Sequence, residues 1–224
     1  MSAAAPLSTY HERQQFMRCG LHAVNNMLQR RAYTTTDFER IAADLAAFGP
    51  EGRGAHLANP HRAVLKLGNY DANVVLVALS LAGFEAAWCV RTPPAELRAA
   101  ARAPDTLGFL VNVSKFFSRH WIAVRKLTDD GCWGLFDSNA PQPQLFASED
   151  DVCFVLFPLC LTRFTSPFFF HCSSPQLLAT LTKYSSGESG ALLIRVYAPE
   201  SAGKTAVEYA RSFCTPRDAA SPAL

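Results

Sequence analysis

Several features that would assign a chain of 224 residues to a common protein class are absent from this sequence. The N-terminal stretch MSAAAPLSTYHERQ has no basic segment followed by an apolar core, so we predict no secretory signal and a reducing, cytoplasmic location. The formal charge is only +2, and lysine and arginine form no long run, which argues against a nucleic-acid groove. We expect a monomer with no nucleic acid among its partners.

The seven cysteines are an odd number at irregular spacing, and they include no C-x-x-C pair. This pattern argues against a disulfide framework and against a zinc ribbon. We therefore expect most of the cysteines to be buried free thiols, and we expect the protein to need no metal and no cofactor.

The first half of the sequence predicts helices. Thr36 with Glu39 forms a capping-box pattern before apolar residues at helical spacing. Asp71 and Gly83 are the candidate N-cap and C-cap of a third helix, which is apolar nearly all round and is expected to be buried. The predicted helices cover residues 19–29, 36–45, 72–82 and 92–97, and residues 48–61 form an expected exposed loop.

The second half is richer in predicted strands. Its segments of β-branched, Leu and aromatic residues cover 84–90, 107–113, 120–127, 132–138 and 191–198, with a last helix over 175–184. The turn Thr128-Asp129-Asp130-Gly131 joins two of these strands, and pairing as a hairpin would bring His120 and Asp137 to the same end. Helices first and antiparallel strands after them indicate an α+β fold with N-terminal helices packed on an antiparallel sheet.

The organisation along the chain is one folded unit with two tails. We predict a disordered N-terminus over residues 1–9, a folded domain over 10–198 and a flexible tail over 199–224, where periodicity is lost. Residues 151–174 are rich in Phe and are neither alternating nor helical. Prolines and Arg163 interrupt this run, so a membrane span is disfavoured; a covered insertion is favoured, and a translated intron is the other explanation.

Cys19, His120 and Asp137 are the candidate catalytic set. A thiolate is the reactive form of cysteine, and the start of a helix and a nearby imidazolium both lower the pKa of a thiol. Nucleophilic catalysis also needs an imidazole within hydrogen-bond reach and a group that fixes its tautomer. Each residue alone has a structural explanation: a buried thiol, a strand-end histidine and a turn aspartate.

An oxyanion formed at Cys19 would need hydrogen-bond donors. The Cys19 backbone N–H at the helix start is one candidate, because the first N–H groups of a helix lack internal partners. Gln14 is the side-chain candidate and Gln15 its rival, and spacing alone does not choose between them. Cys19 and His22 form a C-x-x-H pair, but no second ligand pair lies at a spacing suited to zinc.

Three segments together resemble one known family. YHERQQFMRCGLHAVNNMLQ resembles the nucleophile segment of Josephin-domain cysteine proteases, HWIAVRKL with WGLFDS resembles their His and Asp/Asn segment, and GNYDANVVLVAL resembles one of their helices. The likeness spans about residues 10–140 and is closer to the short single-domain members than to the ataxin-3 type. PQLLATLTKY with ALLIRVYA resumes it, so residues 10–198 resemble one catalytic domain.

The resemblance implies a papain-like α+β fold and a deubiquitinase that cleaves isopeptide bonds, with ubiquitin and ubiquitinated proteins as partners. By position it implies Cys19 as nucleophile, His120 as base, Asp137 as orienter and Gln14 as oxyanion donor. The turn between the His and Asp strands is longer than in the family, and the Phe-rich segment interrupts the domain. Two alternatives stay open: a weakly active or inactive ubiquitin-binding regulatory module, and a cysteine protease for another substrate.

Overall fold

The computed structural model describes residues 9–48, 59–62, 68–89, 92–115, 118–146 and 192–213. The predicted helix over 175–184, the Phe-rich segment 151–174 and most of the loop over 48–61 lie outside the described residues, as does the N-terminal segment 1–8. In the described part no helix is long and apolar enough to cross a membrane.

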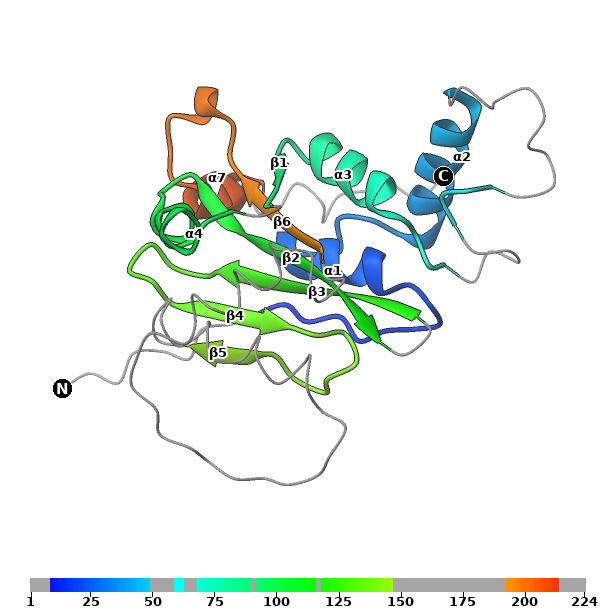
Figure 1. The fold of residues 1–224 in the computed structure, drawn as a ribbon, viewed down its shortest axis with the longest axis horizontal. Coiled ribbons are helices and arrows are strands. Elements are labelled where there is room, and N and C mark those ends of the chain that lie inside the picture. Colours follow the sequence, from blue (N-terminus) through cyan, green and yellow to red (C-terminus); the bar gives the residue numbers. More distant parts are fainter. Residues whose placement is uncertain are drawn as a thin grey trace, which may run out of the picture.

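A six-stranded antiparallel sheet forms the centre of the described structure (Figure 1). Its strands lie side by side in the order β1-β6-β2-β3-β4-β5, so the strand from near the C-terminus lies between two earlier ones. The bounds are β1 Glu85–Trp88, β2 Thr106–Lys115, β3 Ser118–Lys126, β4 Trp133–Phe136, β5 Gln144–Phe146 and β6 Leu192–Tyr197. The prediction of an α+β fold with an antiparallel sheet is confirmed.

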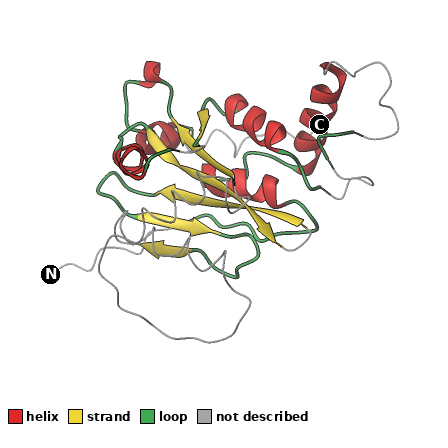
Figure 2. Cartoon of the chain, viewed as in Figure 1, coloured by secondary structure: helices red, strands yellow, loops and turns green. Residues whose placement is uncertain are grey.

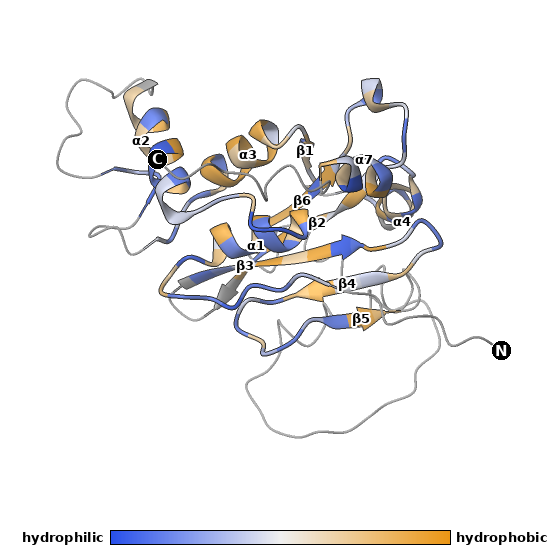
Figure 3. Ribbon diagram, turned by 180° about the vertical axis from the view of Figure 1, so that it is seen from behind, coloured by the Kyte–Doolittle hydropathy of each residue, from blue (hydrophilic) through white to orange (hydrophobic). Residues whose placement is uncertain are grey.

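The helices cover the sheet on both faces (Figure 2). They are α1 Cys19–Leu28, α2 Thr35–Phe48, α3 Ala72–Leu81, α4 Pro94–Arg102, the 3₁₀ turn η3 Glu200–Ala202 and α7 Ala206–Ser212. All ten residues of α1 are buried, because this helix lies between the sheet and α3. Seen from behind, α1 crosses β3 with α3 beside it (Figure 3).

The sheet separates two hydrophobic cores, as the alternation of side chains along β3 requires. Trp121 and Ala123 belong to the core under α1 and α3, whereas Ile122 and Val124 belong to the core under α4. Gly20 faces this strand, because a Cβ built there would lie in van der Waals contact with the Trp121 ring, at 3.4 Å. The start of α1 is thus held directly against β3.

The predicted capping box of α2 was wrong by two residues. The helix begins at Thr35, and the reciprocal bonds join Thr34 and Asp37: the Asp37 carboxylate accepts from Thr34 N–H at 2.8 Å, and the Thr34 hydroxyl accepts from Asp37 N–H at 3.4 Å. Glu39 instead accepts from the Tyr70 hydroxyl at 2.9 Å. The sequence contains two overlapping Thr-x-x-acid patterns, Thr34 with Asp37 and Thr36 with Glu39. The Glu39 carboxylate binds the Tyr70 hydroxyl instead of the helix N-terminus, so Asp37 forms the capping box.

The third predicted helix is confirmed, with one correction to its burial. Asp71 caps α3 by accepting from Val74 N–H at 3.1 Å, and Gly83 has a positive φ of 85° just after it. The helix is buried along one side only, and Leu81 at its end is 66% exposed. The other side of the helix is apolar but is not buried, so apolar composition on all sides did not show burial on all sides.

The predicted flexible tail over residues 199–224 is corrected for its first part. Residues 206–212 form α7, where Thr205 accepts from Glu208 N–H at 3.2 Å and the Glu208 side chain returns to Thr205 N–H. Val207 is buried, and the hydroxyl of Tyr209 donates to Gly83 O at 3.2 Å. A capping-box pattern was present in the sequence, but a helix of two turns gives too few residues to show periodicity.

The short helix predicted over 92–97 is also longer than expected, because α4 continues to Arg102.

Candidate active site

Cys19 is the first residue of α1 and is 5% exposed. The preceding Arg18 has φ −103° and ψ 27°, which is not helical, and no side chain caps the helix. The first N–H groups of α1 therefore have no capping side chain, and the positive end of the helix dipole lies at the thiol. Such a position at a helix start is typical of cysteines that act as nucleophiles.

The chain before Cys19 is fixed by a second segment. Met17 forms an isolated bridge with Gly68, and Met17 O accepts from Asn69 N–H at 2.5 Å. A Cβ on Gly68 would lie 2.4 Å from Met17 O, so only glycine permits this approach. Phe16 has a positive φ of 57°, a conformation uncommon for a bulky side chain, and it is 67% exposed. The turn into α1 is thus a constrained one.

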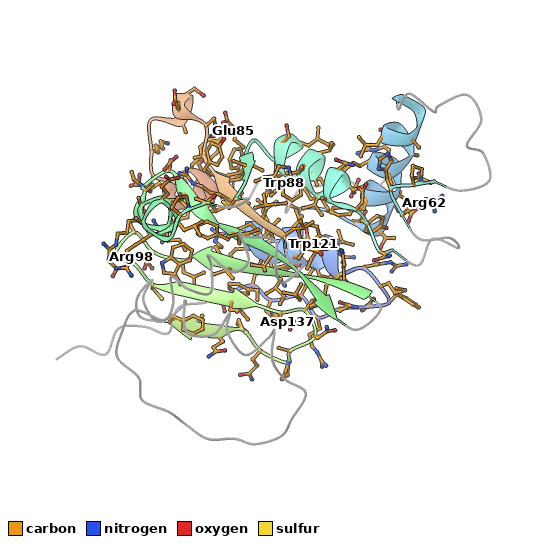
Figure 4. All side chains as sticks on the ribbon, viewed as in Figure 1. Arg62, Glu85, Trp88, Arg98, Trp121 and Asp137 are labelled. Carbon is orange, nitrogen blue, oxygen red and sulfur yellow. The ribbon has the colours of Figure 1, made fainter. Side chains whose placement is uncertain are left out.

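His120 and Asp137 meet at the end of the β3–β4 hairpin. Ala123 pairs with Phe136 in the antiparallel register. The chain just before Ala123, which includes His120, therefore lies beside the chain just after Phe136, which begins with Asp137. The His120 Nε2 to Asp137 Oδ1 distance is 2.6 Å, and both side chains are buried. The predicted proximity of these two residues is confirmed, and Asp137 lies by the end of β4 (Figure 4).

Asp137 is itself held in place by the following turn. The Asn139 backbone N–H donates to Asp137 Oδ1 at 2.8 Å, which is the same oxygen that faces His120. The Asn139 side-chain nitrogen lies 3.2 Å from His120 Nε2. The imidazole therefore has a fixed carboxylate at Nε2 and an amide beside the ring, whose nitrogen lies 3.5 Å from Nδ1.

The electrostatics favour a protonated His120. Burial alone would lower its pKa, but hydrogen bonds with Asp137 and Cys19, and the negative charge at both, raise the pKa from 6.5 to about 9. Because Nε2 is bound to Asp137, Nδ1 is the ring nitrogen left for the thiol. The arrangement can therefore hold an imidazolium beside the Cys19 side chain at neutral pH, which is a general acid already charged next to a candidate nucleophile.

Gln14 lies against the residue that follows Asp137. Its backbone N–H donates to Ser138 O at 2.7 Å, and its Oε1 accepts from the Ser138 hydroxyl at 3.2 Å. Its Nε2 donates to Phe16 O at 2.7 Å. Gln15 is exposed, and its backbone N–H donates to His22 Nε2 at 3.3 Å. Of the two glutamines, Gln14 is the one in contact with the turn that carries the orienter.

His22, considered above as a zinc ligand with Cys19, has protein partners on both ring nitrogens. Its Nδ1 lies 2.8 Å from Glu12 Oε2, and its Nε2 accepts from the backbone. The described residues contain no group of three or more His, Cys, Asp or Glu side chains arranged for a metal. The Cys19-x-x-His22 spacing here reflects one face of a helix.

Sequence reasoning missed Glu12, Ser138 and Asn139. Ser138 and Asn139 follow the orienter directly, and Glu12 lies two residues before Gln14, so nearness in sequence to a candidate residue was the available signal. Asn25 and Asn26 tie α1 to neighbouring segments, because Asn25 Nδ2 donates to Tyr33 O at 2.9 Å and Asn26 Oδ1 accepts from Glu12 N–H at 2.7 Å.

A cysteine at a helix start, with a histidine bonded to a carboxylate on an adjacent hairpin, is the arrangement of papain-type cysteine proteases. Comparison with known proteins agrees with this class. The Josephin family model matches residues 14–160, a span that contains all four candidate residues. The chain belongs to the Josephin family, whose domain is of the cysteine-protease, deubiquitinase type.

Individual relatives support the assignment. Josephin-2 of Mus musculus is 35% identical over 158 residues, covering 66% of this chain and 78% of the relative, and Josephin-2 of Homo sapiens gives the same values. A Josephin-like protein of Arabidopsis thaliana is 33% identical and covers 64% of this chain and 42% of its own length. An Ataxin-3 homolog of the same plant is 28% identical, covering 60% of this chain and 49% of its own length.

Proposed function

We propose that this protein is a thiol-dependent deubiquitinase that hydrolyses isopeptide bonds of ubiquitin conjugates. Membership of the Josephin family supports the substrate class. The observation that carries the chemistry is His120, whose ring binds the Asp137 carboxylate at 2.6 Å through Nε2 and whose pKa is raised by Asp137 and by the nearby Cys19. Ubiquitin and ubiquitinated proteins are the proposed partners, and the cytoplasm and a monomeric state stay predictions from the sequence.

The first half of the reaction follows from the charges at the site. The Cys19 thiolate attacks the isopeptide carbonyl carbon, and the carbonyl oxygen becomes an oxyanion bound by the Cys19 backbone N–H and the Gln14 side-chain amide. His120 gives its proton to the lysine nitrogen as the C–N bond breaks. The products of this step are a free lysine amine and a thioester between Cys19 and the ubiquitin C-terminus.

The second half restores the enzyme. Neutral His120 takes a proton from a water molecule, which attacks the thioester carbonyl. The C–S bond breaks and releases the thiolate beside the imidazolium, and the carboxylic acid formed at the ubiquitin C-terminus gives the second proton of the water to solvent as it leaves as a carboxylate. Asp137 stabilises the imidazolium in both halves and keeps the Nδ1 side of the ring toward the sulfur.

Cleavage of isopeptide-linked diubiquitin by the purified protein tests the proposal. Wild-type protein should yield monomeric ubiquitin, and Cys19→Ala should yield none while retaining the fold. Cys132→Ala is a matched control, because this partly exposed free thiol lies in the hairpin turn before β4, and it should cleave at the wild-type rate. Cleavage by Cys19→Ala would contradict the proposed nucleophile.

One observation favours a weakly active or regulatory form of the same module. Gln14 Nε2 donates to Phe16 O, so one of its two N–H groups is bound within the protein. An oxyanion donor held in this way must reorient or use its second N–H group during catalysis. Titration with ubiquitin separates the two functions: binding by a well-folded protein that leaves diubiquitin uncut would favour the regulatory module.

A further inference from the structure

The segment that carries Gln14 is fixed from α1, although it forms no strand. Amide side chains of α1 and of its C-cap residue take the place of a neighbouring strand: Gln29 bonds both backbone groups of Tyr10, and Asn26 bonds both backbone groups of Glu12. These four bonds are 2.7–3.3 Å long. The main chain just before Gln14 therefore keeps a set distance from the helix that begins at Cys19.

Glu12 adds a charged contact to this anchoring. One carboxylate oxygen, Oε2, lies 2.8 Å from His22 Nδ1 and accepts from Asn25 Nδ2 at 3.0 Å, while the Tyr10 hydroxyl donates to Oε1. Although burial disfavours the charged carboxylate, the bonds from His22, Tyr10 and Asn25 lower the pKa of Glu12. The carboxylate is thus ionised and shared by three donors.

His22 links Glu12 to Gln15, the residue after Gln14, because it bonds to both. Its Nε2 accepts from Gln15 N–H, so Nδ1 is the ring nitrogen that donates to Glu12. The ring is 9% exposed and bonds to Glu12 on one side of Gln14 and to Gln15 on the other. Glu12 and His22 together fix the backbone on both sides of Gln14.

Ser138 fixes the side chain of Gln14 from the opposite side. It is 2% exposed, its carbonyl accepts from Gln14 N–H, and its hydroxyl donates to Gln14 Oε1 at 3.2 Å. A carboxamide has an accepting end and a donating end, so a bond to Oε1 decides where the NH₂ group points. A rotated Gln14 amide would lose this bond and present an oxygen, which repels an oxyanion.

We propose that Ser138 and the Glu12–His22 pair are positioning residues: they hold the Gln14 amide so that the N–H group not bonded to Phe16 O points toward the reacting carbonyl. Ser138 selects the orientation of the amide, and Glu12–His22 fixes the main chain from which the amide extends. The inference rests on the proposed function, because it assigns these residues to the oxyanion step of that reaction. Ser138 also joins the oxyanion residue to the orienter, since it follows Asp137 directly.

The kinetics of substituted proteins distinguish positioning of Gln14 from a purely structural role of these residues. The test compares Ser138→Ala, Glu12→Gln and the double variant Ser138→Ala/Gln14→Ala with Gln14→Ala alone, and the exposed Ser201→Ala is the matched serine control. Three quantities are measured: kcat and KM for a ubiquitin C-terminal amide, the rate of iodoacetamide alkylation at Cys19, and Tm. Alkylation needs an activated thiolate but no oxyanion donor, so it isolates the nucleophile.

If these residues position Gln14, kcat should fall about tenfold or more in Ser138→Ala and in Glu12→Gln. This loss should be smaller than the roughly 10²- to 10³-fold loss caused by removing a whole oxyanion donor. KM and the alkylation rate stay at wild-type values, and Ser201→Ala matches the wild type throughout. In the double variant the loss equals that of Gln14→Ala alone, because Ser138 acts only through the amide. A wild-type kcat in Ser138→Ala, a multiplied loss in the double variant, or alkylation that falls with kcat would overturn the proposal.

Failure of the proposed function leaves the positioning claim testable. If folded wild-type protein cleaves no ubiquitin substrate, backbone hydrogen exchange at Gln14 and Gln15 replaces kcat as the readout. Gln in place of Glu12 offers one accepting oxygen instead of two, so these amides should exchange at least several-fold faster in Glu12→Gln than in wild type. Equal exchange rates in the two proteins would overturn the anchoring by Glu12 and His22.

Discussion

Replacing Asp137 by Asn removes the negative charge beside His120 while leaving an oxygen that can accept from the ring. In the wild type the pKa of His120 is raised from 6.5 to about 9, which corresponds to about 3 kcal/mol in favour of the imidazolium. A carboxylate at hydrogen-bond distance accounts for about 1–3 pKa units of such a shift. Asp137→Asn should therefore lower the pKa of His120 by that amount and still orient the ring, as Asn does in Cys-His-Asn proteases.

The assay is a pH titration of the histidine ring signals by NMR, with the His120 signal assigned from a His120→Gln variant. Wild-type His120 should titrate near pH 9 and the Asp137→Asn variant clearly lower, and the alkaline decline of kcat/KM should move with it, because the imidazolium protonates the leaving amine. A His120 midpoint at 6.5 in the wild type, or the same midpoint in both proteins, would refute the charge assignment.

The same shift fixes the sign of the effect on stability. Because the folded-state pKa of His120 lies above its unfolded value, the stabilisation is complete below about pH 6.5 and is lost as the pH rises through about 9. Asp137→Asn should therefore lower the free energy of unfolding more at pH 6 than at pH 9.5. Urea unfolding at the two pH values measures this difference, and an equal loss at both would contradict the linkage.

Three further substitutions test the site and the fold. Gln14→Ala should lower kcat about 10²- to 10³-fold, whereas Gln15→Ala should leave it unchanged, as measured on a ubiquitin C-terminal amide; equal effects would remove the assignment of Gln14. Gly108→Ala should destabilise the protein by about 1–3 kcal/mol in urea unfolding, because a Cβ there would lie 2.2 Å from Val124 O on the paired strand, and an unchanged midpoint would contradict this register. Asp71→Ala should lower the unfolding free energy by about 1 kcal/mol through loss of the α3 cap, and no loss would mean that the cap contributes nothing.

The fold could be predicted where the signal is local. Asp71 and Gly83 bound α3 as expected, and the turn ending in Gly131 joins β3 to β4. The position of β6 between β1 and β2 could not be predicted, because pairing such as Trp88 with Ile194 joins residues far apart in the chain. Burial of a helix face was also unpredictable for α3, since apolar composition does not say which side has a neighbour.

For the candidate site, the sequence predicted the proximity of His120 and Asp137 but not the residues that hold the candidate catalytic side chains in place. Cys19 and His120 have a recognisable local sequence, and hairpin pairing brings Asp137 to His120 without knowledge of the rest of the fold. Ser138 and Gln14 are 124 positions apart, and their contact depends on the orientation of two side chains. No spacing rule connects such residues, because their distance is set by how α1 and the sheet pack.

The most direct test of deubiquitinase activity is the intact mass of the protein after incubation with a ubiquitin probe that carries a C-terminal electrophile, with Cys19→Ala and Cys132→Ala alongside. The proposed function predicts a gain of one ubiquitin mass in the wild type and in Cys132→Ala, and no gain in Cys19→Ala. A well-folded wild-type protein that forms no adduct, or an adduct that persists in Cys19→Ala, would contradict a ubiquitin-directed thiol protease with its nucleophile at the start of α1.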